Sequence, residues 1–387
     1  MSEIRVNSLG NESNTGGPVL SGITTFSGQQ YFIPPTGTTA QRPSGCPPGS
    51  IRFNTDSSKL EYWQGTVWLE FEASSVELGN QLVTNSAGGT GTRGVFMGGG
   101  NPTVKTDIDY ITIPTLGNAQ DFGDLSGAER GANNGQIASR TIGLMIGGDS
   151  PATNGDVEKL IFSSTGSSVD SGLNFTARRL SAGCSNQTRA ILAGGYDNPS
   201  GADNNIIECT EIASLGSKQD FGDLTLSRYF PSGVSSSVRG IFIGGIDVGV
   251  DEVNIIDYVT ISSTGNAQDF GDMSEKGRKN TASNSTRGVL AGGYIDPGVN
   301  TNVIEFITIA TTGNSQDFGD MDVAKRDAAA VSSPIRMVIA GGYDGVSFYD
   351  AMDYITILTT GNSIDFGDLV GTDRFRPTGA SNGHGGL

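Results

Sequence analysis

Residues 287–294 read RGVLAGGY, an arginine followed by a short apolar run and a pair of glycines. The same pattern occurs six times, and successive copies lie 47 to 50 residues apart. The first glycines of the six copies are Gly98, Gly147, Gly194, Gly244, Gly292 and Gly341. Six units therefore occupy residues 93–387, and a repeat of this length predicts a fold that assembles copies of one small unit.

Each unit repeats one internal order, which residues 280–321 show most clearly. A polar segment, NTASNST, precedes the glycine-containing run, and a loop, IDPGVNTN, follows it. The apolar stretch VIEFITIA, a TTGN turn and the segment SQDFGDM complete the unit. Four short runs separated by Gly, Asn and Pro predict four strands per unit. The pattern therefore favours an all-β fold, a six-bladed β-propeller.

The apolar run before the glycines should form a strand that is covered on both faces. Its apolar residues are consecutive rather than alternating, as expected where a neighbouring blade lies on each side. The paired glycines should then permit a close approach of two backbones, where a side chain would not fit.

The segment QDFGD occurs in four units, and IDFGD occurs in the last. Asp-Phe-Gly is also the tripeptide with which protein kinases hold magnesium, but that ligand is needed once, beside a phosphate-binding loop and a lysine. Five copies without those partners predict a structural role, in which each Phe fills the gap between adjacent blades and the aspartates cap turns. The phenylalanines are Phe122, Phe221, Phe270, Phe318 and Phe366. The second unit has Ser171 instead, so its junction should be the least well filled.

Composition and charge exclude several classes of function. The 387 residues include 58 glycines and carry a net charge of −17, which disfavours binding to nucleic acid or to anionic lipid. The sequence predicts neither a secretion signal nor a membrane-spanning segment. The three cysteines, Cys46, Cys184 and Cys209, should be small buried side chains, with a Cys184–Cys209 bridge as the one pairing to test.

Catalytic and metal-binding patterns are weak. His384 is the only histidine and lies in the terminal segment, which excludes multi-histidine metal sites and leaves little room for a Ser-His-Asp arrangement. A carboxylate pair for glycoside hydrolysis remains an alternative, although no pair stands out. We therefore predict no catalytic residue, no resident metal and no cofactor.

The loops after the paired glycines differ in every unit, and loops on a rigid scaffold are where recognition usually resides. Their acceptors and aromatic faces suit sugars or a loosely bound calcium ion. The alternative for each residue is a turn-forming role without a ligand. The candidate ligand-binding residues are Asp149, Tyr196, Asp197, Asn198, Tyr294, Asp296, Tyr343 and Asp344.

Together these motifs resemble the kelch repeat, with Phe in place of its usual Trp, over about three quarters of the chain. The resemblance rests on the paired glycines, the fourth-strand Phe and two further series. The third-strand aromatics are Tyr110, Tyr258, Phe306 and Tyr354, and the following arginines are Arg130, Arg179, Arg228, Arg278, Arg326 and Arg374. It implies that the variable loops and the arginines share one face, while leaving the function open. We expect these arginines to pair with nearby carboxylates.

The C-terminal stretch RPTGASNGHGGL resembles the polar first strand of a further unit. We expect residues 377–384 to return to the first blade and supply its first strand. The alternative is that TNSAGGTGT, residues 84–92, supplies that strand locally.

The N-terminal region does not repeat the pattern. We divide it into an extended segment (1–36), a small β module (37–72) and a linker (73–92) before the propeller (93–387). The module resembles one that is widespread in bacteriophage tail fibres and other virion appendages. Its matching positions are Thr39, Ala40, Arg42 and Pro43, then Gly49, Ile51, Arg52, Phe53, Asn54, Thr55 and Asp56, then Gly65 and Trp68. The alternative is an unrelated short β-hairpin domain.

This second resemblance implies a non-enzymatic virion structural protein of a tailed bacteriophage. The implied role is a tail fibre or surface appendage that adheres to host glycans, attaches to other virion proteins through its N-terminal region and forms a homotrimer. Extended polar segments bury little apolar surface alone, which favours order through self-association or docking. Alternatives are a purely structural head-decoration or tail component and a glycan-degrading propeller enzyme.

Overall fold

The computed structural model describes residues 34–57, 59–70, 93–100, 103–150, 152–197, 201–249, 251–371 and 374–387. The described residues are all-β, with strands and one 3-10 turn, η1 (Thr39–Gln41), and no α-helix. Contacts divide the chain into two units, Met1–Val76 and Glu77–Leu387. Within the described part, no helix is long and apolar enough to cross a membrane. The extended segment and the linker lie almost entirely outside the described residues.

The smaller unit is one four-stranded sheet in the order β1 (Thr36–Gly37), β2 (Ile51–Asn54), β3 (Lys59–Trp63) and β4 (Trp68–Glu70). Its polar centre is the fully buried Glu61, which accepts a 2.7 Å hydrogen bond from Asn54 Nδ2. Arg42 and Arg52 also pair with this carboxylate, and the guanidinium of Arg42 lowers its pKa. The module residues Arg42, Arg52 and Asn54 therefore hold the sheet together.

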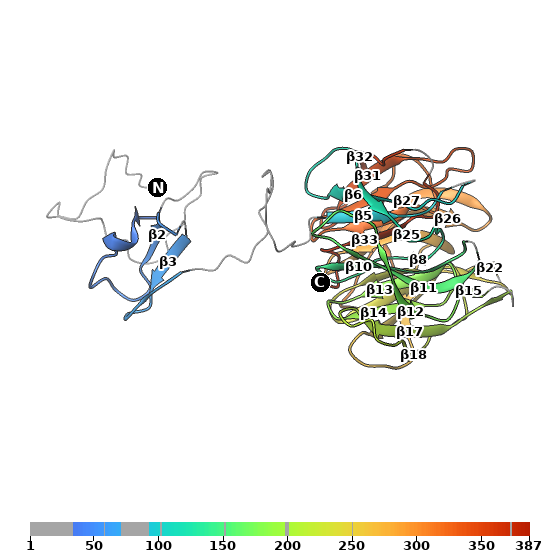
Figure 1. The fold of residues 1–387 in the computed structure, drawn as a ribbon, viewed down its shortest axis with the longest axis horizontal. Coiled ribbons are helices and arrows are strands. Elements are labelled where there is room, and N and C mark those ends of the chain that lie inside the picture. Colours follow the sequence, from blue (N-terminus) through green and yellow to red (C-terminus); the bar gives the residue numbers. More distant parts are fainter. Residues whose placement is uncertain are drawn as a thin grey trace, which may run out of the picture. The chain divides into compact units, whose positions relative to one another are not determined.

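In the larger unit, the described residues form six principal sheets (Figure 1). Sheet 1 contains β33 (Thr378–Ser381), β5 (Arg93–Met97), β6 (Asp107–Thr112) and β7 (Gln120–Asp124). Sheet 2 contains β9 (Ile137–Ala138), β10 (Ile142–Gly148), β11 (Asn154–Ile161) and β12 (Val169–Asn174). Sheet 3 contains β13 (Ser181–Ser185), β14 (Arg189–Ala193), β17 (Ile206–Glu211) and β18 (Gln219–Asp223), with β8 (Asn133–Asn134) as a fifth strand.

Sheet 4 contains β19 (Ser232–Ser235), β20 (Arg239–Ile243), β23 (Ile255–Thr260) and β24 (Gln268–Asp272). Sheet 5 contains β25 (Gly277–Ser283), β26 (Arg287–Ile295), β27 (Val299–Thr308) and β28 (Gln316–Asp320). Sheet 6 contains β29 (Ala329–Ser332), β30 (Arg336–Ala340), β31 (Ala351–Thr356) and β32 (Ile364–Asp368). Two small hairpins extend from sheets 3 and 4: β15 (Tyr196–Asp197) with β16 (Ala202–Asp203), and β21 (Ile246–Asp247) with β22 (Asp251–Glu252).

The C-terminal strand completes sheet 1, as expected from its sequence. In β33, Thr378 lies opposite Met97 of β5 and Ser381 lies opposite Gly94, in antiparallel register. The prediction that residues near 377–384 pair with the first unit is confirmed. The alternative segment, residues 84–92, lies outside the described residues.

The second strand of each sheet is covered on both faces, as the consecutive apolar residues predict. In β5, Val95 and Met97 pack against sheet 2, whereas Phe96 packs against sheet 6. The first glycine of every pair has a positive φ, between 54° and 72°. A Cβ atom on Gly98 would lie 2.3 Å from the carbonyl oxygen of Glu129, which confirms the need for glycine there.

The repeated phenylalanines fill the junctions between sheets, and this prediction is confirmed. Phe122 is 3% exposed and joins a cluster with residues of sheets 1 and 2. Phe366 occupies the equivalent place between sheet 6 and sheet 1. Two backbone hydrogen bonds reinforce the first junction, from Gly166 N to Phe122 O at 2.6 Å and from Ser168 N to Asp124 O at 2.8 Å. The same pair of bonds recurs at the junctions of Phe221, Phe270, Phe318 and Phe366.

The junction of sheets 2 and 3 is different, as Ser171 predicts. At its bulge, strand β12 has one residue more than the equivalent strand β7 of sheet 1. Leu173 and Phe175 enter the core in place of the missing Phe. Among the described residues, this junction lacks the glycine-to-phenylalanine backbone bond of the others. A cavity of about 480 Å³ opens beside Ser171 and Leu215. The junction is therefore filled by other side chains, but less completely.

Serine hydroxyls link the first strands of the sheets to one another. Each hydroxyl belongs to the last residue of its strand and donates to the carbonyl oxygen that ends a neighbouring first strand. The bonds run from Ser381 to Ser332 (2.6 Å), Ser332 to Ser283 (2.7 Å), Ser283 to Ser235 (2.9 Å), Ser235 to Ser185 (2.8 Å) and Ser185 to Ala138 (2.9 Å).

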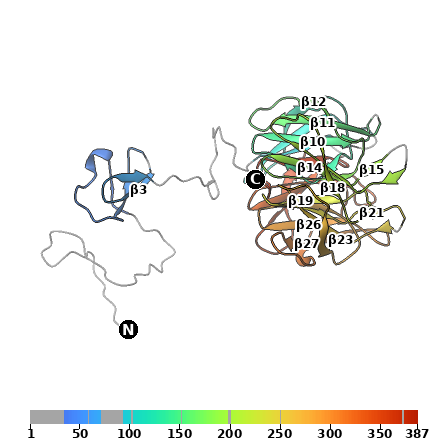
Figure 2. The same cartoon turned by 90° about the horizontal axis from the view of Figure 1, so that it is seen from below.

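Figure 1 and Figure 2 both show the C-terminus on the side of the larger unit opposite β15.

Candidate functional site

The variable loops and the connections that carry the arginines lie on one face of the larger unit. Backbone hydrogen bonds join them at three sheets: Tyr196 N to Arg179 O (2.9 Å), Ile246 N to Tyr229 O (2.7 Å) and Tyr343 N to Arg326 O (2.9 Å). Because β15 and β21 belong to these loops, the face lies opposite the C-terminus (Figure 2). We call it the loop face.

The arginine series from the sequence is two series in the structure. Arg228 and Arg374 are fully buried inside the sheets, whereas Arg130, Arg179, Arg278 and Arg326 stand one position further along and line the loop face. The treatment of all six as equivalent was wrong, because the number of residues between the end of the fourth strand and the arginine varies from unit to unit.

The buried cations are structural, and the expected pairing with carboxylates holds for them. Each reaches a carboxylate on the third strand of its own sheet. The pairs are Arg178–Glu208 (3.1 Å), Arg228–Asp257 (2.9 Å), Lys325–Asp353 (2.9 Å) and Arg374–Asp109 (2.8 Å). Sequence reasoning missed Arg178 and Lys325, although an acidic residue at one position of the third strand, Glu208 or Asp353, was a signal for a buried partner.

On the loop face, arginines and aromatic rings alternate in a closed circuit of contacts, which we call the arginine–aromatic ring. Each contact joins a guanidinium to a ring face, apart from one contact between two aromatic rings. The circuit is Phe230–Arg278 (4.3 Å), Arg278–Tyr294 (4.8 Å), Tyr294–Arg326 (4.4 Å), Arg326–Tyr343 (5.4 Å), Tyr343–Phe375 (6.1 Å), Phe375–Arg376 (4.8 Å) and Arg376–Phe230 (4.7 Å). Contacts of this kind stabilise the arrangement most where they are shielded from water.

The ring borders a pocket where the six first strands begin, which we call the axial pocket. Its cavity volume is about 30 Å³, and its wall includes Leu180, Phe230, Arg278, Asp327 and Arg376. Four of these residues have left-handed backbones, with φ between 55° and 59°. Such a conformation is costly for residues other than glycine and is common at binding sites.

Backbone hydrogen bonds hold these strained residues in place. Arg376 N donates to Asp327 O at 2.9 Å, Leu180 N to Gly131 O at 2.7 Å, and Phe230 N to Leu180 O at 2.8 Å. The pocket wall is therefore preformed.

The arginines of the loop face outnumber the carboxylates with which they pair. Asp149 pairs with Arg130 at 3.2 Å and with Arg179 at 3.0 Å. Asp327 likewise serves two arginines, Arg326 at 3.6 Å and Arg376 at 3.7 Å. Burial lowers the pKa of Arg376, and Asp327 opposes that effect. Two carboxylates thus serve four arginines of the loop face.

The structure brings several predicted site residues into this face. Tyr294 and Tyr343 belong to the arginine–aromatic ring. Tyr196 lies 5.3 Å from both Arg179 and the ring of Tyr229, and Asp149 lies between two arginines. Sequence reasoning missed Phe230, Phe375 and Arg376, which are single occurrences without a repeated signal.

Other predicted residues are not brought together there. Asp344 caps its own turn by accepting from the backbone N–H groups of Ser347 and Val346, and these bonds lower its pKa. This geometry favours the turn-forming alternative for Asp344. Asp197 lies in β15, and Asn198 lies outside the described residues.

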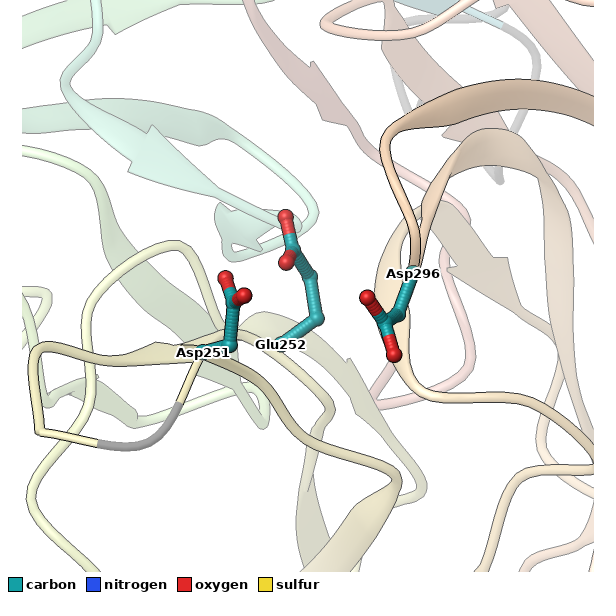
Figure 3. A group of neighbouring side chains, drawn as sticks. All are labelled: Asp251, Glu252 and Asp296. Atoms are coloured by element: carbon teal, nitrogen blue, oxygen red, sulfur yellow. The ribbon is translucent and has the colours of Figure 1, made fainter.

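Asp296 belongs to a separate acidic cluster with Asp251 and Glu252 (Figure 3). Ligand oxygens of the three carboxylates lie within 4.8 Å of one another, and Glu252 is the buried member. Burial raises the pKa of Glu252, and its hydrogen bond with Asp251 adds to the shift. Carboxylate oxygens are the ligands that calcium prefers, so the chemistry fits the calcium binding considered from sequence.

His384 is buried, and its hydrogen bonds show that it cannot activate a nucleophile. Its Nδ1 accepts from the N–H of Gly386 at 3.1 Å, so the proton of the neutral ring is on Nε2. Nε2 lies 3.2 Å from both Ser185 Oγ and Ala138 O, and burial lowers the pKa of the ring to about 4. A nitrogen that already carries a proton cannot take one from Ser185.

The cysteines are free thiols, so the Cys184–Cys209 bridge is not formed. Both of these residues are buried, as expected, whereas Cys46 is half-buried. Burial raises the pKa of the Cys184 thiol, which makes it inert.

Neither a protein-family model nor a curated protein matches this chain.

Proposed function

We propose that the six sheets form a closed, six-bladed, kelch-like β-propeller. Three features support this architecture. Apolar clusters join each sheet to the next, and one of them joins sheet 6 to sheet 1. Serine hydroxyls connect all six first strands. The C-terminal strand β33 pairs with β5, the first described strand of the larger unit in sequence. Pairing between the two ends of a chain in this way would close a ring of blades.

We propose further that the chain is a non-enzymatic structural protein of a tailed-bacteriophage virion. In this role it is a tail fibre or surface appendage, attached and trimerised through its N-terminal region, whose propeller adheres to host-surface glycans. The resemblance of the small module to virion appendages supports the location. Its residues Arg42, Arg52 and Asn54 converge on the buried Glu61, so the matching positions form one folded motif.

The arginine–aromatic ring on the loop face carries the binding part of this proposal. Strands that are buried on both faces hold the variable loops, and the ring sets cationic and aromatic groups around a preformed pocket. Sugars are recognised by the combination of flat apolar faces and planar hydrogen-bonding groups. The protonation of His384 and the burial of Cys184 support a binding role over an enzymatic one.

Adsorption of the labelled full chain to host cells tests this function. Binding to intact cells and to their isolated surface polysaccharide, with no release of reducing sugar, is the expected result. Co-purification with virions without any cell binding would favour the structural alternative of a head-decoration or tail component. Release of reducing sugar would favour the glycan-degrading enzyme.

A further inference from the structure

Among the described residues, Arg278 differs from the other arginines of the loop face because no carboxylate forms an ion pair with it. Its guanidinium lies between the rings of Phe230 and Tyr294, at 4.3 and 4.8 Å, and its Nε is buried without a hydrogen-bond partner. Glu252 is near enough for Arg278 to oppose the rise in the pKa of Glu252. The side chain lines the axial pocket.

The other charges around the pocket are already paired. Asp327 is shared by Arg326 and Arg376, and Lys279 pairs with Glu305 of its own sheet at 3.7 Å. The pocket therefore presents one half-buried guanidinium without an ion-pair partner among the described residues. A guanidinium offers five donors in a planar fork that matches the two oxygens of a carboxylate. An unpaired buried donor costs free energy, and an anion at this position removes that cost.

The rest of the wall suits a small polyhydroxylated molecule. Leu180 adds an apolar side chain to the wall. Asn134, half-buried at the same wall, donates only a long 3.4 Å bond to Lys279 O and remains able to meet a hydroxyl group. With a cavity volume of about 30 Å³, the pocket has room for a carboxylate group, so the rest of a glycan residue would lie at its mouth.

We propose that the axial pocket binds the carboxylate of an acidic sugar residue, with Arg278 as its principal donor. This inference rests on the proposed glycan adhesion and names the chemical class of the glycan. Arg376, held by Asp327, lies beside the ligand and adds positive charge, while Arg278 makes the direct contact.

Calorimetric titration of the full chain tests this assignment. The probes are tetrasaccharides of galacturonic, glucuronic and mannuronic acid, sialyl-lactose, and the carboxyl-reduced form of each. At least one acidic probe should bind, and carboxyl reduction should weaken its binding tenfold or more. The same loss is expected in Arg278→Gln, with partial retention in Arg278→Lys. Affinity should also fall between 20 and 500 mM salt, because the attraction of charges is screened.

Arg140→Gln is the matched control, since Arg140 is an exposed arginine outside the pocket lining and should leave binding unchanged. Thermal unfolding of each variant shows whether the fold is retained. Equal binding of carboxyl-reduced probes, no effect of Arg278→Gln, or no binding by any acidic probe would overturn the assignment. So would equally tight binding of hexaglutamate, which would point to an acidic peptide as the ligand. If the chain still adheres to host cells in those cases, the proposed function stands and only the acidic-sugar assignment fails.

Discussion

The structural position of a residue can be predicted from the sequence much better when the residue recurs in a constant register than when its spacing varies. Phe122 and its four counterparts were assigned to the junctions because each keeps the same neighbours. The arginines were misaligned, since two residues lie between Phe175 and Arg178 whereas four lie between Leu369 and Arg374. One residue of difference exchanges a buried position for one on the loop face, and a single sequence contains no signal for that exchange.

Truncation of Phe122 tests the junction at the residue scale. Phe122→Ala should lower the free energy of unfolding by about 3 to 5 kcal/mol, because it removes a large ring from a packed junction and leaves a cavity. Chemical denaturation measures the change. Asp121→Asn is the control, since Asp121 is exposed on the same strand, and it should leave both stability and binding unchanged. A loss below 1 kcal/mol in Phe122→Ala would show that the ring does not fill the junction.

Glu129 predicts a pH dependence of stability. Burial raises its pKa from 4.5 to about 7, and the nearby carboxylates of Asp149 and Asp156 contribute. Since the folded state then binds the proton more tightly than the unfolded state, the stabilising effect is complete below pH 4.5 and is lost as pH rises to about 7. Glu129→Gln should therefore unfold at a higher temperature than the parent at pH 8 and at the same temperature at pH 4.

Thermal unfolding at the two pH values measures this difference, with Glu211→Gln as the control because Glu211 is exposed. If the difference in unfolding temperature between the parent chain and Glu129→Gln is the same at pH 4 and at pH 8, the raised pKa of Glu129 is contradicted.

At the scale of elements, the strands were predictable and their partners only partly so. The match of residues 377–384 to a first strand identified β33, because polar small residues recur there in every unit. The path of the tail beyond β33 was not predictable, since His384 and Gly386 have no counterpart elsewhere in the repeat. The extra residue in β12 was also hidden, because Ser171 looked like a substitution rather than a displacement.

Removal of residues 378–387 tests the role of the C-terminal element. The deletion takes away β33, leaves the edge of β5 unpaired and breaks the serine bonds of Ser381. A fall of at least 10 °C in the unfolding temperature is expected, measured by differential scanning calorimetry. Removal of residues 383–387 alone keeps β33 and should cost less, since only the contacts of the tail are lost. An unchanged unfolding temperature in the longer deletion would show that β33 does not fasten the larger unit.

At the scale of the molecule, composition and repeat length were enough to predict an all-β chain with a distinct N-terminal module. The resemblance to the kelch repeat implied which loops share a face, and the variation of those loops pointed to the tyrosines of the candidate site. The lack of an ion-pair partner for Arg278 could not be predicted, because it depends on which carboxylates pair with the other arginines. The net charge of −17 does not indicate a pocket lined by arginines, which becomes evident only from the ion pairs in the structure.

The central claim is that the chain displays its larger unit on the outside of a virion for adhesion. The most direct measurement is electron microscopy of intact particles labelled with an antibody fragment against residues 93–387, combined with an adsorption assay using the same fragment. The account predicts label on a surface appendage and blocked adsorption to host cells. Unlabelled particles, or label with adsorption unchanged, would contradict it.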